Sequence, residues 1–232
     1  MTNILCIETS GSHCSLALAV GESVYSRDEQ LQRTHNEHLL ALLDGLLQQA
    51  QVTPRQLDVV AFGCGPGSFT GVRIAAAAAQ ALALASDAPV VSVPSTLAWI
   101  LAAQLREPEL KGCVCSIRSR GQAYYLAAYE RRERAAASEA PALQWEQSQP
   151  DQLVDAPPAW LASVPVAGWR VVGSRPDWWS QSLALDWSEG LAPSATACLP
   201  WVRQQYGDGY ARPAEEALPR YIQGDSPWKK QA

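Results

Sequence analysis

The chain is poor in the features that most readily reveal a function. Its 232 residues carry a net charge of −5, which predicts no overall basic surface for nucleic acid or an acidic membrane. Any contact with RNA would come from a local patch or through a partner. No apolar run reaches the roughly 18 residues of a membrane span, because Arg73 and Gln80 interrupt the alanine-rich stretch. The first residues are not typical of a leader peptide. We therefore expect no membrane partner.

Cysteine and histidine are also too sparse to indicate a metal or redox centre. The six cysteines form neither a CxxC pair nor a disulfide-dense pattern. We expect free, buried thiols in a reducing cytoplasm, with a redox or metal role as the alternative. His35 and His38 lie three residues apart, whereas zinc sites on helices more often use a spacing of four and a third ligand. The sequence thus predicts no metal site.

What is present is a globular composition, 47% hydrophobic and 18% charged, long enough for one large domain or two lobes. In the first half, strand-like and helical patterns alternate, which is typical of an α/β lobe with a mixed sheet. Thr34, followed by Glu37, indicates a capping box at the first helix start. The expected strands are residues 4–7, 15–20, 23–28, 57–62 and 89–93, and the expected helices are 34–50, 70–86 and 95–105.

The composition changes after residues 107–108. Residues 113–117 and 123–129 predict a hairpin, residues 164–173 a strand and residues 194–206 a helix, whereas periodicity is weak beyond Arg134. Eight of the nine tryptophans lie from Trp145 onward, and no internal repeat is evident. We expect a first lobe of residues 1–106 and a second, smaller lobe of residues 107–232. The C-terminal tail could pack back on the first lobe.

The most informative segment is residues 62–74, FGCGPGSFTGVRI, which five alanines follow. A strand breaks into a loop around Gly65, Gly67, Ser68 and Gly71 and then restarts as a helix of small residues. Glycines permit tight turns and bare backbone N–H groups where anions are favoured. The loop lacks the lysine of a nucleotide P-loop and the spacing of a dinucleotide fingerprint. Two interpretations stay open: a cradle or contact surface, and a tight turn that lets the helix lie flat on the sheet.

Other candidate sites are weaker. Glu8, Thr9 and Ser10 follow the first predicted strand, and such a hairpin approaches a metal-bound phosphate in actin-like ATPases, although strand ends often carry these residues. Ser68 is outside a GxSxG elbow and has no His–Asp pair near it in sequence, so we expect no catalytic nucleophile. The basic cluster at residues 131–134 is interpreted as a solvated strand end, with nucleic-acid contact as the alternative.

Three stretches resemble the bacterial TsaB (YeaZ) family: residues 4–18, residues 65–74, and residues 218–221 with 228–230. The resemblance is strong over residues 1–106, patchy to about residue 190, and returns at the end. Its glycine motif is the specific part. The resemblance implies a two-lobed actin-like fold of the sugar kinase and heat-shock ATPase superfamily, with mixed sheets flanked by helices. It also implies a part in making threonylcarbamoyladenosine on tRNA, at the adenosine next to the anticodon (position 37).

In that family the chain is a non-catalytic scaffold. The resemblance therefore implies a TsaD-like catalytic paralogue and a TsaE-like ATPase as partners, and a homodimer when the paralogue is absent. It implies tRNA contact through the complex, no intrinsic cofactor, and nucleotide at most at the subunit junction. The rival hypothesis is a stand-alone actin-fold ATPase or small-molecule kinase, which would bind magnesium nucleotide alone.

The chain departs from the family pattern at two places. Glu8 stands where the family usually has Asp. The hairpin motif, typically DARMGEVY, appears as IRSRGQAY at residues 117–124, so both acidic positions are uncharged and Arg120 adds a charge. Because magnesium needs hard oxygen ligands, these changes disfavour intrinsic ATPase chemistry.

The resemblance places the partner interface on the two helices predicted at residues 34–50 and 70–86. One has more apolar width than a single buried stripe requires, and the other is rich in alanine, which lets another backbone approach. The expected interface residues are His38, Leu39, Leu42, Leu43, Leu46, Arg73, Ile74, Ala75, Ala78, Ala79 and Leu82. A homodimer through the same face would compete with the heterodimer.

Overall fold

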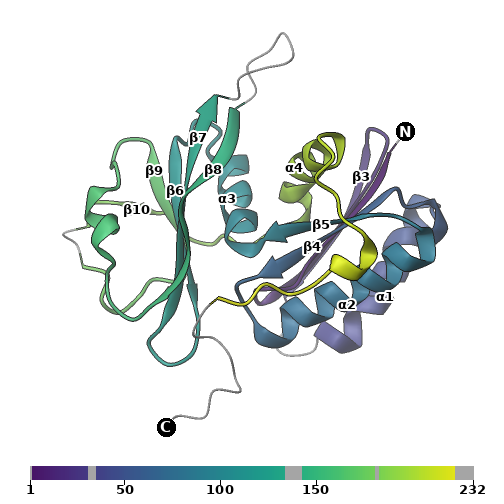
Figure 1. The fold of residues 1–232 in the computed structure, drawn as a ribbon, viewed down its shortest axis with the longest axis horizontal. Coiled ribbons are helices and arrows are strands. Elements are labelled where there is room, and N and C mark those ends of the chain that lie inside the picture. Colours follow the sequence, from purple (N-terminus) through teal and green to yellow (C-terminus); the bar gives the residue numbers. More distant parts are fainter. Residues whose placement is uncertain (1, 31–34, 134–142, 181–182, 223–232) are drawn as a thin grey trace. The chain divides into compact units, whose positions relative to one another are not determined.

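A computed structural model describes residues 2–30, 35–133, 143–180 and 183–222 (Figure 1). The chain forms two compact units. Of the described residues, the first unit contains those up to Ala102 and those of Ala192–Arg220, and the second contains those of Ala103–Leu191 with Tyr221 and Ile222. The sequence predicts a second lobe of residues 107–232 whose C-terminal tail could pack back on the first lobe, and in the structure residues 192–220 belong to the first unit.

The first unit contains a five-stranded mixed sheet in the order β3-β2-β1-β4-β5. The strands are β1 (Asn3–Glu8), β2 (His13–Val20), β3 (Ser23–Gln30), β4 (Val59–Gly65) and β5 (Val90–Pro94). β1, β2 and β3 pair antiparallel through tight turns, whereas β4 runs parallel to both β1 and β5. Parallel neighbours need a crossover, and helices supply it here. The predicted mixed sheet is confirmed.

Helices cover both faces of this sheet (Figure 1). Helices α1 (His35–Ala50) and α2 (Phe69–Ser86) lie on one face, where α1 packs on β2 and β3 and α2 packs on β4. Helix α4 (Ala195–Gly207) packs on β1 and β2 across the other face. Helix α3 (Ser95–Arg106) follows β5, and the short 3-10 helix η1 (Pro54–Gln56) precedes β4. The start that Thr34 and Glu37 predict for α1 lies outside the residues whose side chains the structure describes.

The last part of the first unit is a C-terminal strap, residues 211–220. Arg212 exchanges two backbone hydrogen bonds with Val90 of β5, of 2.7 and 2.8 Å. The 3-10 helix η3 (Ala214–Glu216) then buries Ala214 and Ala217 against α2. Finally the Arg220 N–H donates to the carbonyl oxygen of Cys64, at 2.7 Å. These contacts are the reason why residues 192–220 belong to the first unit.

Helix α2 is also the one helix, among the described residues, that is long and apolar enough to cross a membrane. By this measure the expectation that no apolar run is long enough is wrong. The helix nevertheless joins β4 to β5, two neighbouring parallel strands, and it packs on β4 along its length. A helix held at both ends by one sheet, with one face buried on that sheet, is a layer of a globular unit.

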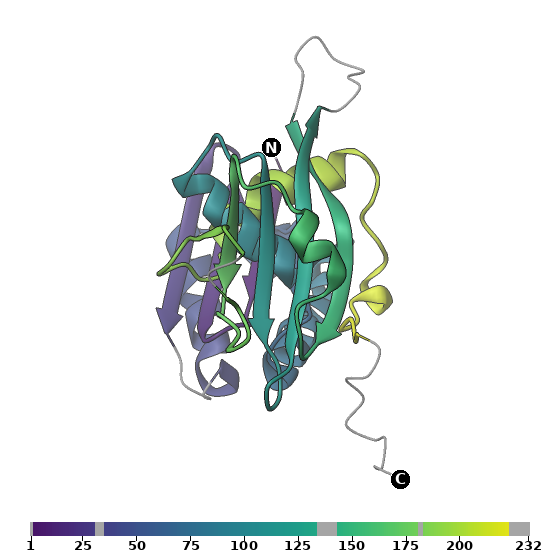
Figure 2. The same ribbon diagram turned by 90° about the vertical axis from the view of Figure 1, so that its left-hand side faces the viewer.

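The second unit repeats this sheet with a different cover (Figure 2). Its order is β10-β9-β6-β7-β8, from β6 (Gly112–Arg118), β7 (Tyr124–Glu133), β8 (Leu143–Val154), β9 (Trp169–Gly173) and β10 (Asp186–Trp187). Pairing directions match the first sheet, since β6–β7–β8 are antiparallel and β9 runs parallel to β6 and β10. The 3-10 helix η2 (Ala159–Ser163) and a tryptophan cluster complete its core, in which Trp169 and Trp179 are buried.

Most predicted elements are confirmed, but in the second unit one predicted strand is shorter than expected and one strand was not predicted. The hairpin of β6 and β7 and helix α4 lie where expected. The weakly periodic stretch contains β8, which is an edge strand with a register shift near Pro150. Only Trp169–Gly173 of the predicted strand 164–173 is β9, because a turn closes between Val166 and Trp169.

Candidate functional site

Two separately predicted signals, the glycine loop and residues 8–10, lie against each other in the first unit. The Ser68 N–H donates to the Ser10 carbonyl oxygen at 2.7 Å, and the Thr9 hydroxyl donates to the Gly71 carbonyl oxygen at 2.8 Å. A Cβ on Gly67 would lie 2.6 Å from the Ser10 oxygen, and one on Gly71 would overlap the Thr9 oxygen. Glycine is therefore needed for the close approach of two backbones.

Several backbone N–H groups of the loop already have acceptors within the protein. Gly65 N–H donates to the Ser95 hydroxyl at 3.0 Å, and Gly71 N–H donates to the Ser68 hydroxyl at 3.2 Å, which caps helix α2. Together with the bond to Ser10, three of the loop's N–H groups have acceptors. An anion cradle needs N–H groups that point outward, so these contacts support the tight-turn interpretation.

Glu8 is buried at the end of β1, next to Gly63 of β4. Its Oε1 accepts the Ser10 N–H at 2.6 Å, whereas Oε2 has no hydrogen-bond partner and lies where a Cβ on Gly63 would be. Burial raises the pKa of Glu8 to about 7, and the hydrogen bond from the Ser10 N–H opposes this rise only in part. A carboxyl that is enclosed and holds its proton to neutral pH is a poor magnesium ligand. The residues thus fit a buried structural acid better than a phosphate site.

The histidines do not converge on a centre. His38 is exposed on α1, while the His35 side chain lies outside the described part of the structure. His13 lies on β2, and its Nδ1 is 2.7 Å from a carboxylate oxygen of Asp28. Among the described residues, no group of three His, Cys, Asp or Glu side chains could hold a metal ion.

All six cysteines are buried free thiols, as the sequence predicts. Burial raises the pKa of Cys14 to about 11 and moves that of Cys113 in the same direction. Since the thiolate is the reactive form, such thiols are poor nucleophiles and poor metal ligands.

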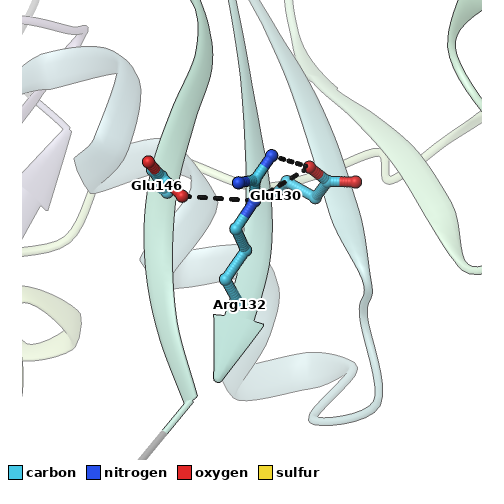
Figure 3. Close-up of polar contacts among 3 residues, drawn as sticks. All are labelled: Glu130, Arg132 and Glu146. Atoms are coloured by element: carbon cyan, nitrogen blue, oxygen red, sulfur yellow. Dashed lines mark hydrogen bonds and ion pairs between the residues drawn. The ribbon is translucent and has the colours of Figure 1, made fainter. Parts of the chain in front are cut away.

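The basic cluster at the end of β7 is held by the protein itself. Arg131 donates to the carbonyl oxygens of Pro108 and Leu110. Arg132 forms ion pairs with Glu130 at 3.1 Å and with Glu146 at 3.2 Å, across β7 and β8 (Figure 3). These contacts support the expected strand end rather than a nucleic-acid site. Because both guanidinium groups already have partners within the protein, they are less available to bind nucleic acid. Residue 134 lies outside the described residues.

The expected partner interface needs a correction. Five of its residues are buried in the unit's own core and offer no surface to a partner, namely Leu39, Leu43, Leu46, Ala75 and Ala79. The others remain on the surface or half-buried, namely His38, Leu42, Arg73, Ile74, Ala78 and Leu82. The helical period identified both helices, but it did not distinguish the inner apolar stripe from the outer one.

The outer face of α2 is almost uncharged. Ala77, Ala81, Leu84 and Ala85 are exposed, and Leu84 keeps 67% of its surface. Arg73 is the single charged residue of this 18-residue helix, and its guanidinium lies 3.3 Å from the Phe69 ring centroid. On α1, Leu40 is also 68% exposed, although the exposed Asp44 follows it one turn later. Sequence reasoning missed these exposed residues, although the apolar character of every turn of α2 was a usable signal.

Comparison with known proteins places this chain in a family. A family model described as "TsaD: tRNA N6-adenosine threonylcarbamoyltransferase" matches residues 19–145. The "tRNA threonylcarbamoyladenosine biosynthesis protein TsaB" of Escherichia coli (strain K12) is 30% identical over 233 residues, which are 98% of this chain and 97% of that protein. The chain belongs to the TsaB family. The protein of the same name from Haemophilus influenzae is also 30% identical, over 98% of this chain and 96% of its own length.

A solved structure extends the TsaB likeness to three dimensions. "YeaZ from Pseudomonas aeruginosa" superposes with a TM-score of 0.77 at 26% identity. The superposition covers 96% of this chain and 100% of the YeaZ chain. The two mixed sheets flanked by helices are therefore the actin-like fold that the TsaB resemblance implies.

This TsaB-family chain is also similar in part to a transferase. A "tRNA N6-adenosine threonylcarbamoyltransferase" from Legionella pneumophila (strain Corby) is 33% identical over 82 residues, which are 35% of this chain and 25% of that protein. The likeness identifies the two families as relatives.

Proposed function

We propose that this chain acts in the synthesis of threonylcarbamoyladenosine on tRNA, as a non-catalytic subunit that pairs with a TsaD-like catalytic paralogue. The uncharged outer face of α2 carries this proposal. Large apolar patches on globular proteins commonly mark interfaces, and small side chains let a partner helix approach closely. The names of the TsaB relatives support the pathway, and the likeness to a transferase supports a paralogue as the partner.

The enclosure of Glu8 supports the non-catalytic part of the proposal. The carboxyl is buried against Gly63, and three N–H groups of the loop already have acceptors within the protein, so neither the acid nor the loop provides an open phosphate site. We therefore propose that the chain needs no cofactor of its own, and that any nucleotide binds at the junction with the paralogue. A TsaE-like ATPase would join this pair, and tRNA would be modified by the complex in the cytoplasm. In the absence of the paralogue, the same α1–α2 face would form a homodimer.

Sedimentation of this chain mixed with its TsaD-like paralogue tests the proposal. We expect a one-to-one complex, and we expect Ala81→Arg to weaken it by roughly 30-fold or more, because an unpaired charge would be buried in the apolar contact. Ala162→Arg, on the 3-10 helix of the second unit, is the matched control and should leave the complex intact. Ala81 is exposed, so its replacement should not unfold the monomer.

The rival function, a stand-alone actin-fold ATPase or kinase, makes the opposite prediction. Such a chain would bind magnesium nucleotide and turn it over alone. ATP hydrolysis by the isolated chain, without a complex in the sedimentation experiment, would overturn our proposal in favour of the rival.

A further inference from the structure

We propose that a cavity at the C-terminal end of α2 receives an arginine side chain of the TsaD-like paralogue. This rests on the proposed function and deepens it, because it names one contact by which the paralogue would be held on the α2 face. Only residues of the first unit form the cavity. Its walls combine apolar side chains with carboxylates and backbone carbonyl oxygens, and this combination is what identifies the occupant.

The cavity is a fixed feature of the first unit. The C-terminal strap lies beside α2 (Figure 1), and a cavity of about 430 Å³ opens between them. Ligand pockets have volumes of roughly 300–1,000 Å³. Ala83 and Leu84 of α2 contribute to one wall, and residues 211–215 of the strap form the other. Both walls are held in place, because the Ala88 N–H donates to the Ala83 carbonyl oxygen at 3.0 Å and the strap is hydrogen-bonded to β5.

The cavity adjoins the uncharged outer face of α2. Leu84 belongs to both, since it lines the cavity and keeps 67% of its surface exposed. Ala77, Ala81 and Ala85 are exposed on the same helix, and alanines about one turn apart offer a partner helix nearly the same contacts. Such a face alone would hold a partner without fixing its position along α2. A charged contact at one end of the helix would fix that register.

The lining of the cavity has two carboxylates and one cation. These are Asp87, Glu215 and Arg212, and all three side chains are exposed. None of them forms a hydrogen bond or an ion pair with the residues that the structure describes. The carboxylates are therefore available to a cation that a partner supplies.

The surrounding chain has the same sign of charge. The strap, the end of α2 and the η1 segment that packs on α2 fall within residues 53–58, 83–90 and 208–217. These ranges contain five carboxylates and two arginines. Asp58 and Asp208 already have partners in the protein, and without them carboxylates still outnumber arginines by three to two.

The end of α2 adds hydrogen-bond acceptors beside the cavity. Carbonyl oxygens in the last turn of a helix lack N–H partners within it and carry the negative end of its dipole. The Ala88 N–H bonds to the Ala83 carbonyl oxygen, and Pro89 has no N–H. No described residue therefore donates to the carbonyl oxygens of Leu84 and Ala85. A cation with several N–H groups would satisfy such acceptors together with the carboxylates.

Arginine fits these walls better than other side chains. Its aliphatic stem would pack on alanine, leucine and proline, and its planar guanidinium has five N–H donors for carboxylates and carbonyls. An apolar side chain would cover Asp87 and Glu215 without pairing them, which costs free energy. An acidic side chain would be repelled by them. Arginine is also enriched among the residues that anchor protein interfaces.

A first test uses the isolated chain and does not depend on the paralogue. N-acetyl-arginine methylamide is titrated into the full chain while the backbone amide resonances are followed by NMR. We expect shifts at Asp87 and Glu215, with an affinity of about 1 mM. N-acetyl-citrulline methylamide, which has the same shape without the charge, is the control. An equal response to citrulline, or to the lysine analogue, would overturn the assignment to arginine.

A second test measures pairing with the TsaD-like paralogue by sedimentation, at low and at high salt. We expect Glu215→Lys to weaken pairing roughly tenfold, with the larger loss at low salt. Glu215→Gln and Asp87→Asn should each cost roughly threefold, because hydrogen bonding remains while the charge is lost. Glu22→Lys, an exposed charge reversal between β2 and β3 of the same unit, is the matched control. Far-UV circular dichroism checks that each variant is folded.

The outcomes separate this inference from the proposed function. Absence of arginine-analogue binding, or a loss for Glu215→Lys no larger than that for Glu22→Lys, overturns the inference. If Ala81→Arg still weakens the complex in that case, the proposed function stands. Binding of the arginine analogue by a chain that forms no complex contradicts the proposed function and supports the cavity as an arginine site.

Discussion

In the first unit, the sheet order β3-β2-β1-β4-β5 is covered by helices on both faces, whereas one face of the same order in the second unit, β8-β7-β6-β9-β10, is covered by a 3-10 helix and tryptophans. An α-helix that covers a sheet turns one face inward and leaves another face outward. Tryptophan fills the same space with a single side chain and adds no second face. The helical cover of the first unit therefore provides an outer apolar surface on α2 that the tryptophan cover does not provide.

The two units also differ at the equivalent end of their central strands. β1 ends at Glu8, which is buried against Gly63 of β4, whereas β6 ends at Arg118, which is exposed beside a turn. The glycine loop after β4 caps α2, so in the first unit this end of the sheet serves packing. In the second unit the corresponding position lies at the surface.

The largest effect should come from the tryptophan cover. Trp179 is buried, stacks on Trp178 at 5.9 Å and meets Trp187 edge-on at 4.9 Å. We expect Trp179→Ala to lower the free energy of unfolding of the second unit by about 3–5 kcal/mol, because it leaves a large cavity. Urea titration followed by far-UV circular dichroism measures this loss. Trp201→Ala, at a half-buried position on α4, should cost clearly less, and equal losses would contradict the distinction between the two covers.

The enclosed acid predicts a pH dependence of the first unit. Glu8 has a pKa of about 7 in the folded chain and an ordinary value of 4.5 when unfolded, so its proton stabilises the fold below pH 4.5. That contribution is lost as the pH rises through 7, and the loss amounts to about 3 kcal/mol. We expect Glu8→Gln to gain about this much relative to the native chain between pH 4.5 and 8. Parallel urea titrations at both pH values measure the gain, and a pH-independent difference would show that Glu8 ionises freely.

A smaller effect separates glycines that pack from glycines that do not. Gly71→Ala should cost about 1–3 kcal/mol, because its Cβ would press on the Thr9 carbonyl. Gly45→Ala in α1 meets no atom within 4 Å and should instead gain about 0.5–1 kcal/mol from helix propensity. Thermal unfolding of the two variants, compared with the native chain, gives both numbers. A neutral Gly71→Ala would mean that the loop yields easily and is not the tight turn described above.

The sequence identified the first unit better than the second, and the physical reason lies in the cover. Helices α1 and α2 repeat apolar residues at helical spacing, so their existence and ends could be read from the chain. The sequence could not show which side of α2 is buried, because alanines occur on every side of this helix. Only its packing on the sheet makes Ala79 buried and leaves Ala81 exposed. The tight packing of Gly71 on Thr9 is a contact across 62 residues, and no local pattern encodes it.

In the second unit, the missing signal was that of β8. This strand lies at a sheet edge, where one side of its backbone is unpaired and polar residues are tolerated, so hydrophobic alternation is weak. Pro150 within it is compatible with an edge strand and its register shift. The tryptophans could be counted but not placed, because a cluster that joins residues 160–187 follows no fixed period.

The C-terminal strap has a consequence for synthesis of the chain on the ribosome. The hydrogen bonds between Val90 and Arg212, and between Cys64 and Arg220, close the first unit with residues that are translated only after Ala103–Leu191 of the second unit. Domains usually fold as they emerge, amino-terminal part first. Here the amino-terminal sheet must wait, with its edge at β5 open, while the whole second unit is translated. A nascent chain stalled before residue 212 would therefore expose that edge to chaperones.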